Sequence, residues 1–400
     1  MSNISTLLLL LCICIIFINA VQFETVYEWK YFDYEWENAS HKEAAIASGD
    51  YNYTRPLVID TDVSKDGRVF ITIIRTDGVP SSLNTVGRHH GPSGPLLRPY
   101  PNWKWTKRGD CNGITSVYRV AIDPCNRLWV LDNGKIGQKV VCSAQLLVFD
   151  LSTDKLIKRI KIPDHLAQNS ETKVGKLITP IVETHGLHCT DVTVYMADVT
   201  GYGLVIYDRG QMWRLESKEF RADPAVSNYT IMGESFTLQD GLLGMAKHPD
   251  VPVLYFRPMS SHNMHSASTT DLKRSRYGFK VRYRTIRDVI PSQAAAMAIS
   301  SGGILFFGLP TEVSLACWNT CKPLDKNSLG IVAHDQERFQ FVSGIKIIPE
   351  CITGANEEVW LVTDRIQKYM AGTTNFTEIN FRVMRADVAQ LIADTVCDSP

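Results

Sequence analysis

Few residues of this 400-residue chain are spaced for catalysis or metal binding. Two histidine pairs, His89-His90 and His185-x-x-His188, have the side chains to ligate a metal or exchange protons, but no cluster of carboxylates accompanies them. Cys317 and Cys321 lack a second Cys or His pair at a zinc-like spacing. We interpret the histidines as exposed loop residues and the two cysteines as half-cystines. The sequence therefore predicts no metal site and no cofactor.

Motifs of hydrolase, nucleotide and calcium sites are missing or incomplete. The chain has no Gly-x-Ser-x-Gly elbow, no Gly-x-x-x-x-Gly-Lys-Ser/Thr loop and no His-Glu-x-x-His pair. The segment Asp62-Val-Ser64-Lys-Asp66-Gly67 begins like a calcium loop, but Ile73 stands at its twelfth position, where a bidentate Glu is needed. We interpret this segment as a hairpin turn.

The first twenty residues predict a signal peptide. Leu7 to Ile18 is almost wholly apolar, too short to span a membrane, and followed by small Ala20 at the expected cleavage point. An uncleaved anchor is the alternative. No later stretch contains eighteen consecutive apolar residues, so we expect a secreted, extracellular chain without a membrane span. Basic and acidic residues number 42 each, so no net field favours nucleic acid as a partner.

Cysteines and glycosylation motifs fit an oxidising compartment. Eight cysteines follow the first twenty residues, and the sequence alone leaves their pairing open, because eight cysteines allow about 105 connectivities. Four Asn-x-Ser/Thr motifs are candidate glycan acceptors if the chain is exported: Asn38, Asn52, Asn228 and Asn375.

A sequence pattern that predicts two strands joined by a turn occurs six times along the chain. Each occurrence has an apolar run, then a polar or Gly-containing turn, then a second apolar run centred on an aromatic residue. The six aromatic residues are Phe70, Trp129, Tyr195, Tyr255, Phe306 and Trp360. Their spacing of roughly 50 to 60 residues fits one four-stranded sheet with loops. Because radially repeated four-stranded sheets form a β-propeller, the sequence predicts an all-β fold, a six-bladed β-propeller in a single domain.

The chain ends are expected to close the ring. Residues 21–55 precede the first repeat, and the blades are expected over about 56–385. We expect Tyr27–Phe32 to pair near a C-terminal strand, Asn380–Met384, because joining both ends in one blade removes the last open sheet edges.

Two short helices are expected outside the blades. The first is predicted at Lys42–Ser48, after a capping box from Ser40 to Glu43, and the second at about 387–394, opened by Asp387.

Propeller geometry places a candidate binding site at one end of the central tunnel. The first strand of each blade lines the axis, so the residues just before these strands ring one mouth. These residues are Ser116, Thr179, Gln239, Asp240, Gln293 and Ser343. Such a ring can orient a small ligand with polar ends over an apolar wall, to which Phe307 would contribute. Alternatively, the polar side chains only satisfy loop backbone groups, and Phe307 belongs to the core.

Longer segments resemble the major royal jelly protein and Yellow family of insects. They include Glu28–Tyr34, Gly78–Asn84, Gly94–Pro101, Leu128–Asp132, Gln239–Gly241, Phe306–Leu309, Cys317–Asn319 and Asn380–Met384. Two of these, Gly78–Asn84 and Cys317–Asn319, are more similar to the royal jelly branch. The resemblance implies a secreted, glycosylated six-bladed propeller. In some relatives its tunnel holds a biogenic amine or a sterol, and some associate with themselves or with a small helical protein.

The resemblance also implies a disulfide pattern. The pairs it suggests are Cys111–Cys142, Cys189–Cys317 and Cys321–Cys351, which leaves Cys125 and Cys397 for each other or free.

Three functional hypotheses follow. The first is a non-enzymatic secreted protein that binds a small ligand, anchored by Gln239, Asp240 and Gln293, or that serves as a nutritional or secretory protein of a gland or venom. The alternative is an enzyme that converts dopachrome, with His185 or Asp240 as the base. The third is an interaction scaffold that depends on its glycans and long loops.

Overall fold

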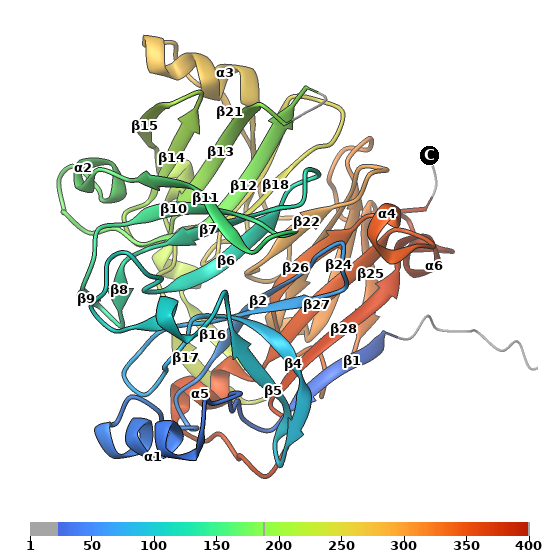
Figure 1. Cartoon of the computed structure of the whole chain (residues 1–400). Coiled ribbons are helices and arrows are strands. Elements are labelled where there is room, and N and C mark those ends of the chain that lie inside the picture. The colour runs from blue at the N-terminus through green and yellow to red at the C-terminus, as the bar shows by residue number, and fades with distance from the viewer. Residues whose placement is uncertain (1–22, 187–188, 399–400) are drawn as a thin grey trace, which may run out of the picture.

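Six four-stranded antiparallel sheets stand in a ring in the computed structural model, which describes residues 23–186 and 189–398 (Figure 1). The innermost strands of neighbouring sheets contact one another all the way around the axis. This confirms the predicted all-β, six-bladed β-propeller. No helix in the described ranges is both long and apolar enough to cross a bilayer.

The blades follow one another along the chain, and in the first five the innermost strand comes first. The first blade contains β2 (Val58–Val63), β3 (Val69–Ile73), β4 (Leu83–Gly91) and β5 (Gly94–Pro99). The second contains β6 (Val117–Ile122), β7 (Arg127–Asp132), β10 (Gln145–Asp150) and β11 (Lys155–Lys161). The third contains β12 (Leu177–His185), β13 (Asp191–Asp198), β14 (Gly203–Asp208) and β15 (Gln211–Glu216).

The last three blades include the closure. The fourth contains β18 (Leu242–Lys247), β19 (Val253–Pro258), β20 (Met264–Ser268) and β21 (Tyr283–Ile286). The fifth contains β22 (Met297–Ile299), β23 (Ile304–Leu309), β24 (Ser314–Asn319) and β25 (Leu329–His334). The sixth contains β26 (Phe341–Ile348), β27 (Glu358–Asp364), β28 (Phe381–Asp387) and, as its outermost strand, β1 (Glu24–Trp29).

Two small hairpins and short helices lie outside the blades. The hairpins are β8–β9 (Lys135–Ile136, Lys139–Val140) and β16–β17 (Asn228–Ile231, Glu234–Thr237). The α-helices are α1 (Ala39–Ser48), α2 (Asp164–Ala167), α3 (Thr269–Arg274), α4 (Glu350–Thr353), α5 (Ile366–Ala371) and α6 (Val388–Ile392). The 3₁₀ helices are η1 (Trp103–Thr106), η2 (Lys218–Phe220), η3 (Pro224–Val226), η4 (Ser275–Tyr277) and η5 (Pro310–Glu312).

The repeated aromatic residues all lie on the second strand of a blade, in β3, β7, β13, β19, β23 and β27. Five of them are buried, and Tyr255 is half-buried against the core of its blade. A large ring at this position fills the space between two packed sheets, where buried aromatic area is a major source of stability. The sequence repeat therefore reports the packing of one blade on the next.

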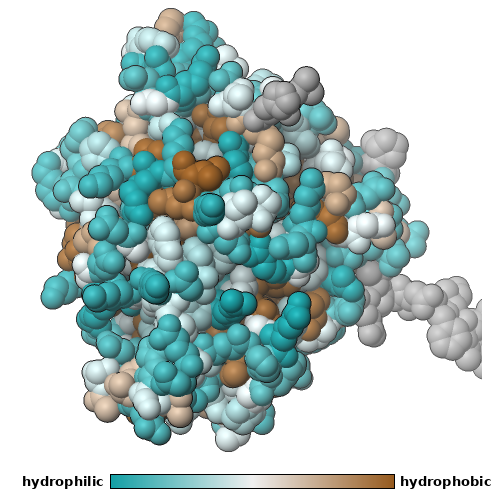
Figure 2. All heavy atoms as spheres, in the orientation of Figure 1, coloured by the Kyte–Doolittle hydropathy of each residue, from teal (hydrophilic) through white to brown (hydrophobic). Residues whose placement is uncertain are grey.

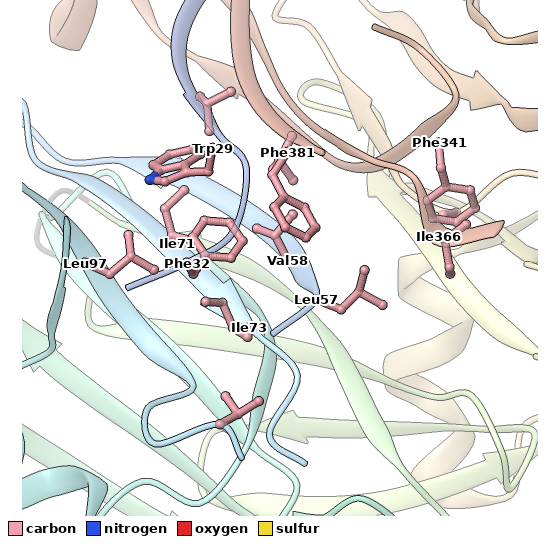
Figure 3. Close-up of a cluster of buried hydrophobic side chains, with 14 of the residues drawn as sticks. Trp29, Phe32, Leu57, Val58, Ile71, Ile73, Leu97, Phe341, Ile366 and Phe381 are labelled. Atoms are coloured by element: carbon pink, nitrogen blue, oxygen red, sulfur yellow. The ribbon is translucent and has the colours of Figure 1, made fainter. Parts of the chain in front are cut away.

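Strand β1 closes the ring by pairing antiparallel with β28, from Glu24 opposite Arg385 to Trp29 opposite Phe381, with one register shift between Thr25 and Tyr27. The Trp29 indole is fully buried and donates to the Pro95 carbonyl of the first blade at 2.6 Å. Phe32 stacks on Phe381 with ring centroids 4.7 Å apart (Figure 3). The expected pairing of the two chain ends is thus confirmed, and the same segment also packs on the first blade.

The first helix begins earlier than expected, and the predicted capping box is wrong. Helix α1 starts at Ala39, and the Asn38 side chain caps it by accepting from the His41 amide at 2.9 Å. Ser40 is therefore already inside the first turn, where it cannot cap. The predicted end is confirmed, since Gly49 adopts the left-handed conformation with φ 78°.

Three disulfides join six of the eight described cysteines, and two of the expected pairs are wrong. Cys111–Cys142 is present, but Cys189 pairs with Cys125 and Cys317 with Cys397. Cys125 follows β6, and Cys189 lies between β12 and β13 of the adjacent blade, so the fold brings these turns together. Cys317 is buried on β24 beneath the segment that follows α6. Cys321 and Cys351 are free, exposed thiols.

Thiol chemistry tests this pattern. Alkylation of the native protein is expected to label Cys321 and Cys351, because these thiols are exposed and unpaired. Digestion without reduction should release three linked peptide pairs, 111–142, 125–189 and 317–397. A 321–351 or 189–317 linkage by mass spectrometry would contradict it.

The closure strand offers a stability test. Trp29→Ala is expected to lower the free energy of unfolding by roughly 3 to 5 kcal/mol, because it removes a fully buried ring from between the first and last blades. Thr25→Ala, an exposed position on the same strand, is the control and should change stability by less than about 0.5 kcal/mol. Equal urea midpoints for the two variants would show that closure does not depend on Trp29.

Candidate functional site

One end of the central tunnel is covered by segments of the chain. Hairpin β16–β17 and helix α5 lie over the mouth from which the inner strands start, and they contact each other. Tyr229 and Ile231 of the hairpin are fully buried in a cluster with Ile178, Leu243 and Phe341, which come from three different blades. Residues of separate blades meet in this way only near the axis, so the hairpin plugs the tunnel.

A buried arginine holds the loops beneath this hairpin. Arg257 is fully buried and donates from Nη2 to the Ser261 and Ser292 carbonyls at 2.6 and 3.0 Å. Its guanidinium lies 5.8 Å from the Phe307 ring. Burial lowers the pKa of Arg257 to about 10, which still leaves it charged at neutral pH.

The residues predicted to ring this mouth are placed there, and the side chains of two of them donate to backbone carbonyls. Gln293 Nε2 donates to the Val226 and Asn228 carbonyls next to the hairpin, at 2.8 and 3.1 Å. Ser343 Oγ donates to the Val58 carbonyl at 3.4 Å.

The remaining ring residues differ in exposure. The Ser116 amide donates to Asp132 at 2.8 Å, and Thr179 is buried on β12. Phe307 is fully buried in a core cluster. Gln239 alone of the ring is an exposed residue, and its carbonyl accepts from the Tyr202 hydroxyl at 3.2 Å.

Asp240 is the one carboxylate of this ring. Its amide is held by Ser260 Oγ at 3.2 Å. Burial raises the pKa of the Asp240 carboxyl to about 6, and the Lys176 ammonium nearby opposes that shift. Asp240 and His185, the two candidate bases, lie at opposite mouths, because Asp240 precedes β18 and His185 ends β12. They are not brought together as an acid–base pair.

The described histidines of the two pairs, His89, His90 and His185, are exposed. His89 Nδ1 is 2.9 Å from Glu35, and His185 Nε2 is 3.7 Å from Glu183. His188 lies outside the described residues. Within the described ranges, no three His, Cys, Asp or Glu side chains form a group that could hold a metal ion.

The opposite mouth holds a cavity of about 440 Å³, at the ends of the inner strands. Its apolar wall comes from Val63, Ile122, Ile299, Ile347, Ile348 and Ile352. Its polar lining includes Asp62, Lys65, Asp123, Lys247 and Glu357, and the free thiol of Cys351 lies at its edge. Because five blades contribute, the cavity is axial. An apolar wall with a few polar groups is the usual composition of a small-molecule pocket.

Two of the acidic side chains that line the cavity are already paired. Asp123 accepts from Arg127 Nε at 2.7 Å and from the Trp129 indole at 2.8 Å. Glu357 accepts from the Ser301 amide at 2.9 Å. These contacts fix the turns around the mouth.

Asp62 is the carboxylate at the base of the cavity. Its oxygens accept from the Val63 and Ile122 amides at 2.9 and 3.1 Å. Burial raises the pKa of Asp62 to about 6, against the attraction of Lys346. At pH 7 the group is ionised, and below about pH 6 it becomes neutral.

Behind Asp62 lies a buried ion-pair network on the axis. Asp60 Oδ2 is 2.9 Å from Lys346 Nζ, and Arg119 Nη1 is 3.7 Å from Asp60 Oδ1. Asp60 is on β2, Arg119 on β6 and Lys346 on β26, so the network joins the first, second and last blades. Lys346 Nζ also donates to the Val120 carbonyl at 2.6 Å.

Sequence reasoning did not assign Asp60, Asp62 or Lys346 to a site. Asp60 and Asp62 stand two residues apart on one strand, so both project to the same face of the sheet. That spacing was a usable signal, because paired acids inside an apolar strand need partners when they are buried.

Comparison with known proteins agrees with this architecture. The family described as "Major royal jelly protein" matches residues 115–397. Major royal jelly protein 9 of Apis mellifera is 46% identical over 386 residues, covering 94% of this chain and 90% of the relative. Major royal jelly protein 8 is 42% identical, over 94% and 93% of the two chains, and major royal jelly protein 1 is 38% identical, over 94% and 89%; both are also from Apis mellifera.

The fold and its axial cavity thus define a six-bladed β-propeller with one open mouth. The chain belongs to the major royal jelly protein family.

The axial network provides a direct test. Lys346→Met is expected to destabilise the fold by about 3 kcal/mol, because it leaves the buried Asp60 carboxylate with only the Val120 amide at 3.3 Å and the more distant Arg119. Lys65→Met, at an exposed position of the cavity lining, is the matched control. A Lys346 variant that unfolds at the same urea concentration as the control would contradict this role.

Proposed function

We propose that this chain is a secreted, non-enzymatic glycoprotein that binds a small, partly apolar ligand in its axial cavity. The observation that carries the proposal is the cavity of about 440 Å³, with apolar walls and the Asp62 carboxylate at its base. Pockets of this size and composition are typical of small-ligand sites.

Secretion and glycosylation are supported by separate features. The sequence begins with a leader-like segment, and three disulfides fit an oxidising compartment. All four Asn-x-Ser/Thr asparagines, Asn38, Asn52, Asn228 and Asn375, are exposed. The family name, which refers to royal jelly, supports a nutritional or secretory role alongside binding.

Among the two ligand classes, the lining favours a biogenic amine over a sterol. An ionised Asp62 would pair with an ammonium group, and charge-assisted hydrogen bonds are stronger than neutral ones. The isoleucine-rich wall would cover the apolar ring of such an amine. A sterol hydroxyl is uncharged, so it would form only an ordinary hydrogen bond with the same carboxylate.

Two matched variants test where and what the cavity binds. Asp62→Asn and Asp240→Asn each remove a carboxyl with a pKa near 6, at the open and the covered mouth respectively. Asp62→Asn is expected to weaken binding of serotonin, dopamine or octopamine about tenfold or more in calorimetric titration, because it removes a charged partner. Asp240→Asn should leave affinity unchanged.

The pH dependence has a defined sign. Amine affinity is expected to be constant above about pH 7 and to fall as pH decreases through about 6, since protonation removes the charge of Asp62. If Asp240→Asn abolishes binding and Asp62→Asn does not, the ligand site lies at the covered mouth and not in the open cavity. Native mass spectrometry of the protein from its source identifies the ligand it carries, and a sterol there would exclude the amine.

The enzymatic alternative has its own readout. Dopachrome decay followed by absorbance is expected to be unchanged by the pure protein. Acceleration that Asp240→Asn or His185→Gln abolishes would establish conversion in place of simple binding.

A further inference from the structure

Residues 273–287 contain seven Lys or Arg and no Asp or Glu, in a chain whose 42 basic and 42 acidic residues balance only over its whole length. They run from α3 through η4 to β21, the outermost strand of the fourth blade. Helix α3 projects from the body at the top of Figure 1, and hydrophilic surface dominates that end of the molecule in Figure 2. We call residues 273–287 the basic tip.

The cations of the basic tip are exposed and lack acidic partners. Six are exposed residues: Arg274, Arg276, Lys280, Arg282, Arg284 and Arg287. Of the seven, Lys273 alone lies within ion-pair distance of a carboxylate in the described structure, with its Nζ 3.2 Å from Glu183. The nearest acids in sequence, Asp271 and Asp288, flank the segment and pair with none of its cations there. The positive charge of the basic tip is therefore not balanced by acidic side chains of the described structure.

Two large aromatic side chains stand among these cations. Tyr277 is 67% exposed and Phe279 is 51% exposed, with Gly278 in a left-handed turn between them. The Arg274 guanidinium lies 4.0 Å from the Phe279 ring and that of Arg276 lies 4.5 Å from the Tyr277 ring. Each ring is thus contacted by an arginine guanidinium, and much of its apolar surface remains exposed to water.

Protection of the sheet edge does not account for this composition. Outermost strands often carry charges that prevent pairing with another chain, and Arg284 on β21 fits that role. Arg274, Arg276 and Lys280 precede the strand and protect no edge. Strand β25, the outermost strand of the next blade, has no Lys or Arg at all.

We propose that the basic tip docks the protein on an anionic lipid surface. Each Lys or Arg near such a surface contributes favourably, and the contributions add over several cations. Tyr and Phe rings at the tip of the projection would enter the headgroup region, where amphipathic aromatic side chains are favoured. The guanidinium groups beside the rings would then reach lipid phosphates.

The exposed rings decide between a lipid surface and a soluble polyanion. A sulfated polysaccharide in solution is bound mainly through cations, and a sugar could stack on only one face of each ring, which leaves the rest of these exposed rings in water. A bilayer interface accepts both kinds of side chain at once. This inference is independent of the axial cavity and of its ligand.

Vesicle co-sedimentation of the full secreted chain tests the proposal. The protein is expected to sediment with vesicles of equimolar phosphatidylcholine and phosphatidylserine, and not with phosphatidylcholine alone. Binding should be strong near 0.1 M salt, where the screening length is about 10 Å, and weak near 1 M, where it is about 3 Å.

Two pairs of variants give matched controls. Arg282→Gln with Arg284→Gln is expected to weaken vesicle binding about 30-fold, from two cations lost. Lys155→Gln with Lys161→Gln removes two exposed cations from β11, the outermost strand of another blade, and should have little effect. Tyr277→Ser with Phe279→Ser should weaken binding about tenfold through lost apolar contact. Thermal melting shows whether each variant is folded.

Three results would overturn the proposal. The first is equal loss in the β11 control, which would show only a general charge effect. The second is unchanged vesicle binding in either tip variant. The third is retention by heparin without vesicle binding, which would make the tip a site for a soluble polyanion.

Discussion

Pairing of β1 with β28 is the constraint on which the ring depends. Without β1 the sixth blade would have three strands, and β28 would present an open edge. The closure also brings Trp29 against the first blade, because its indole donates to the Pro95 carbonyl. The two ends of a 400-residue chain are thus held by strand hydrogen bonds at the rim and by buried aromatic area behind them.

The first and last blades are also joined near the axis, by a buried ion pair. Asp60 on the first blade pairs with Lys346 on the last, and the neighbouring Gly344 lies so close that a Cβ there would come 2.8 Å from Asp60 Oδ1. That close approach explains why glycine stands at 344. A buried pair of this kind adds little to stability by itself, but removing one partner is costly. Rim and axis therefore fix the first and last blades by different interactions, and the cavity forms where the axial strands end.

Sequence reasoning found the features that repeat and missed those that depend on contact between blades. The aromatic residue of each second strand recurs because every blade packs on its neighbour in the same way, so Trp129 and Phe306 could be recognised from spacing alone. Cys125 and Cys189 belong to equivalent turns of adjacent blades, and their separation of 64 residues is about one repeat, a signal of their pairing that went unused. The hairpin that covers one mouth is an insertion in the loop before β18, with no counterpart in the repeat. The order of the strands was enough to place a ring of polar residues at that mouth. It could not show whether those residues are exposed or buried.

Glu183 connects the open mouth with the outer surface of the fourth blade. Its carboxylate lies 3.6 Å from Lys247, which lines the cavity, and 3.2 Å from Lys273, the first cation of the basic tip. The Tyr195 hydroxyl donates to it at 3.0 Å, and these contacts hold the pKa of Glu183 below its ordinary value. One acid therefore neutralises two lysines that face different regions, and the six exposed cations beyond Lys273 find no such partner in the described structure. On the cavity side Lys247 is thus compensated within the protein, whereas the basic tip keeps the charge of its six exposed cations.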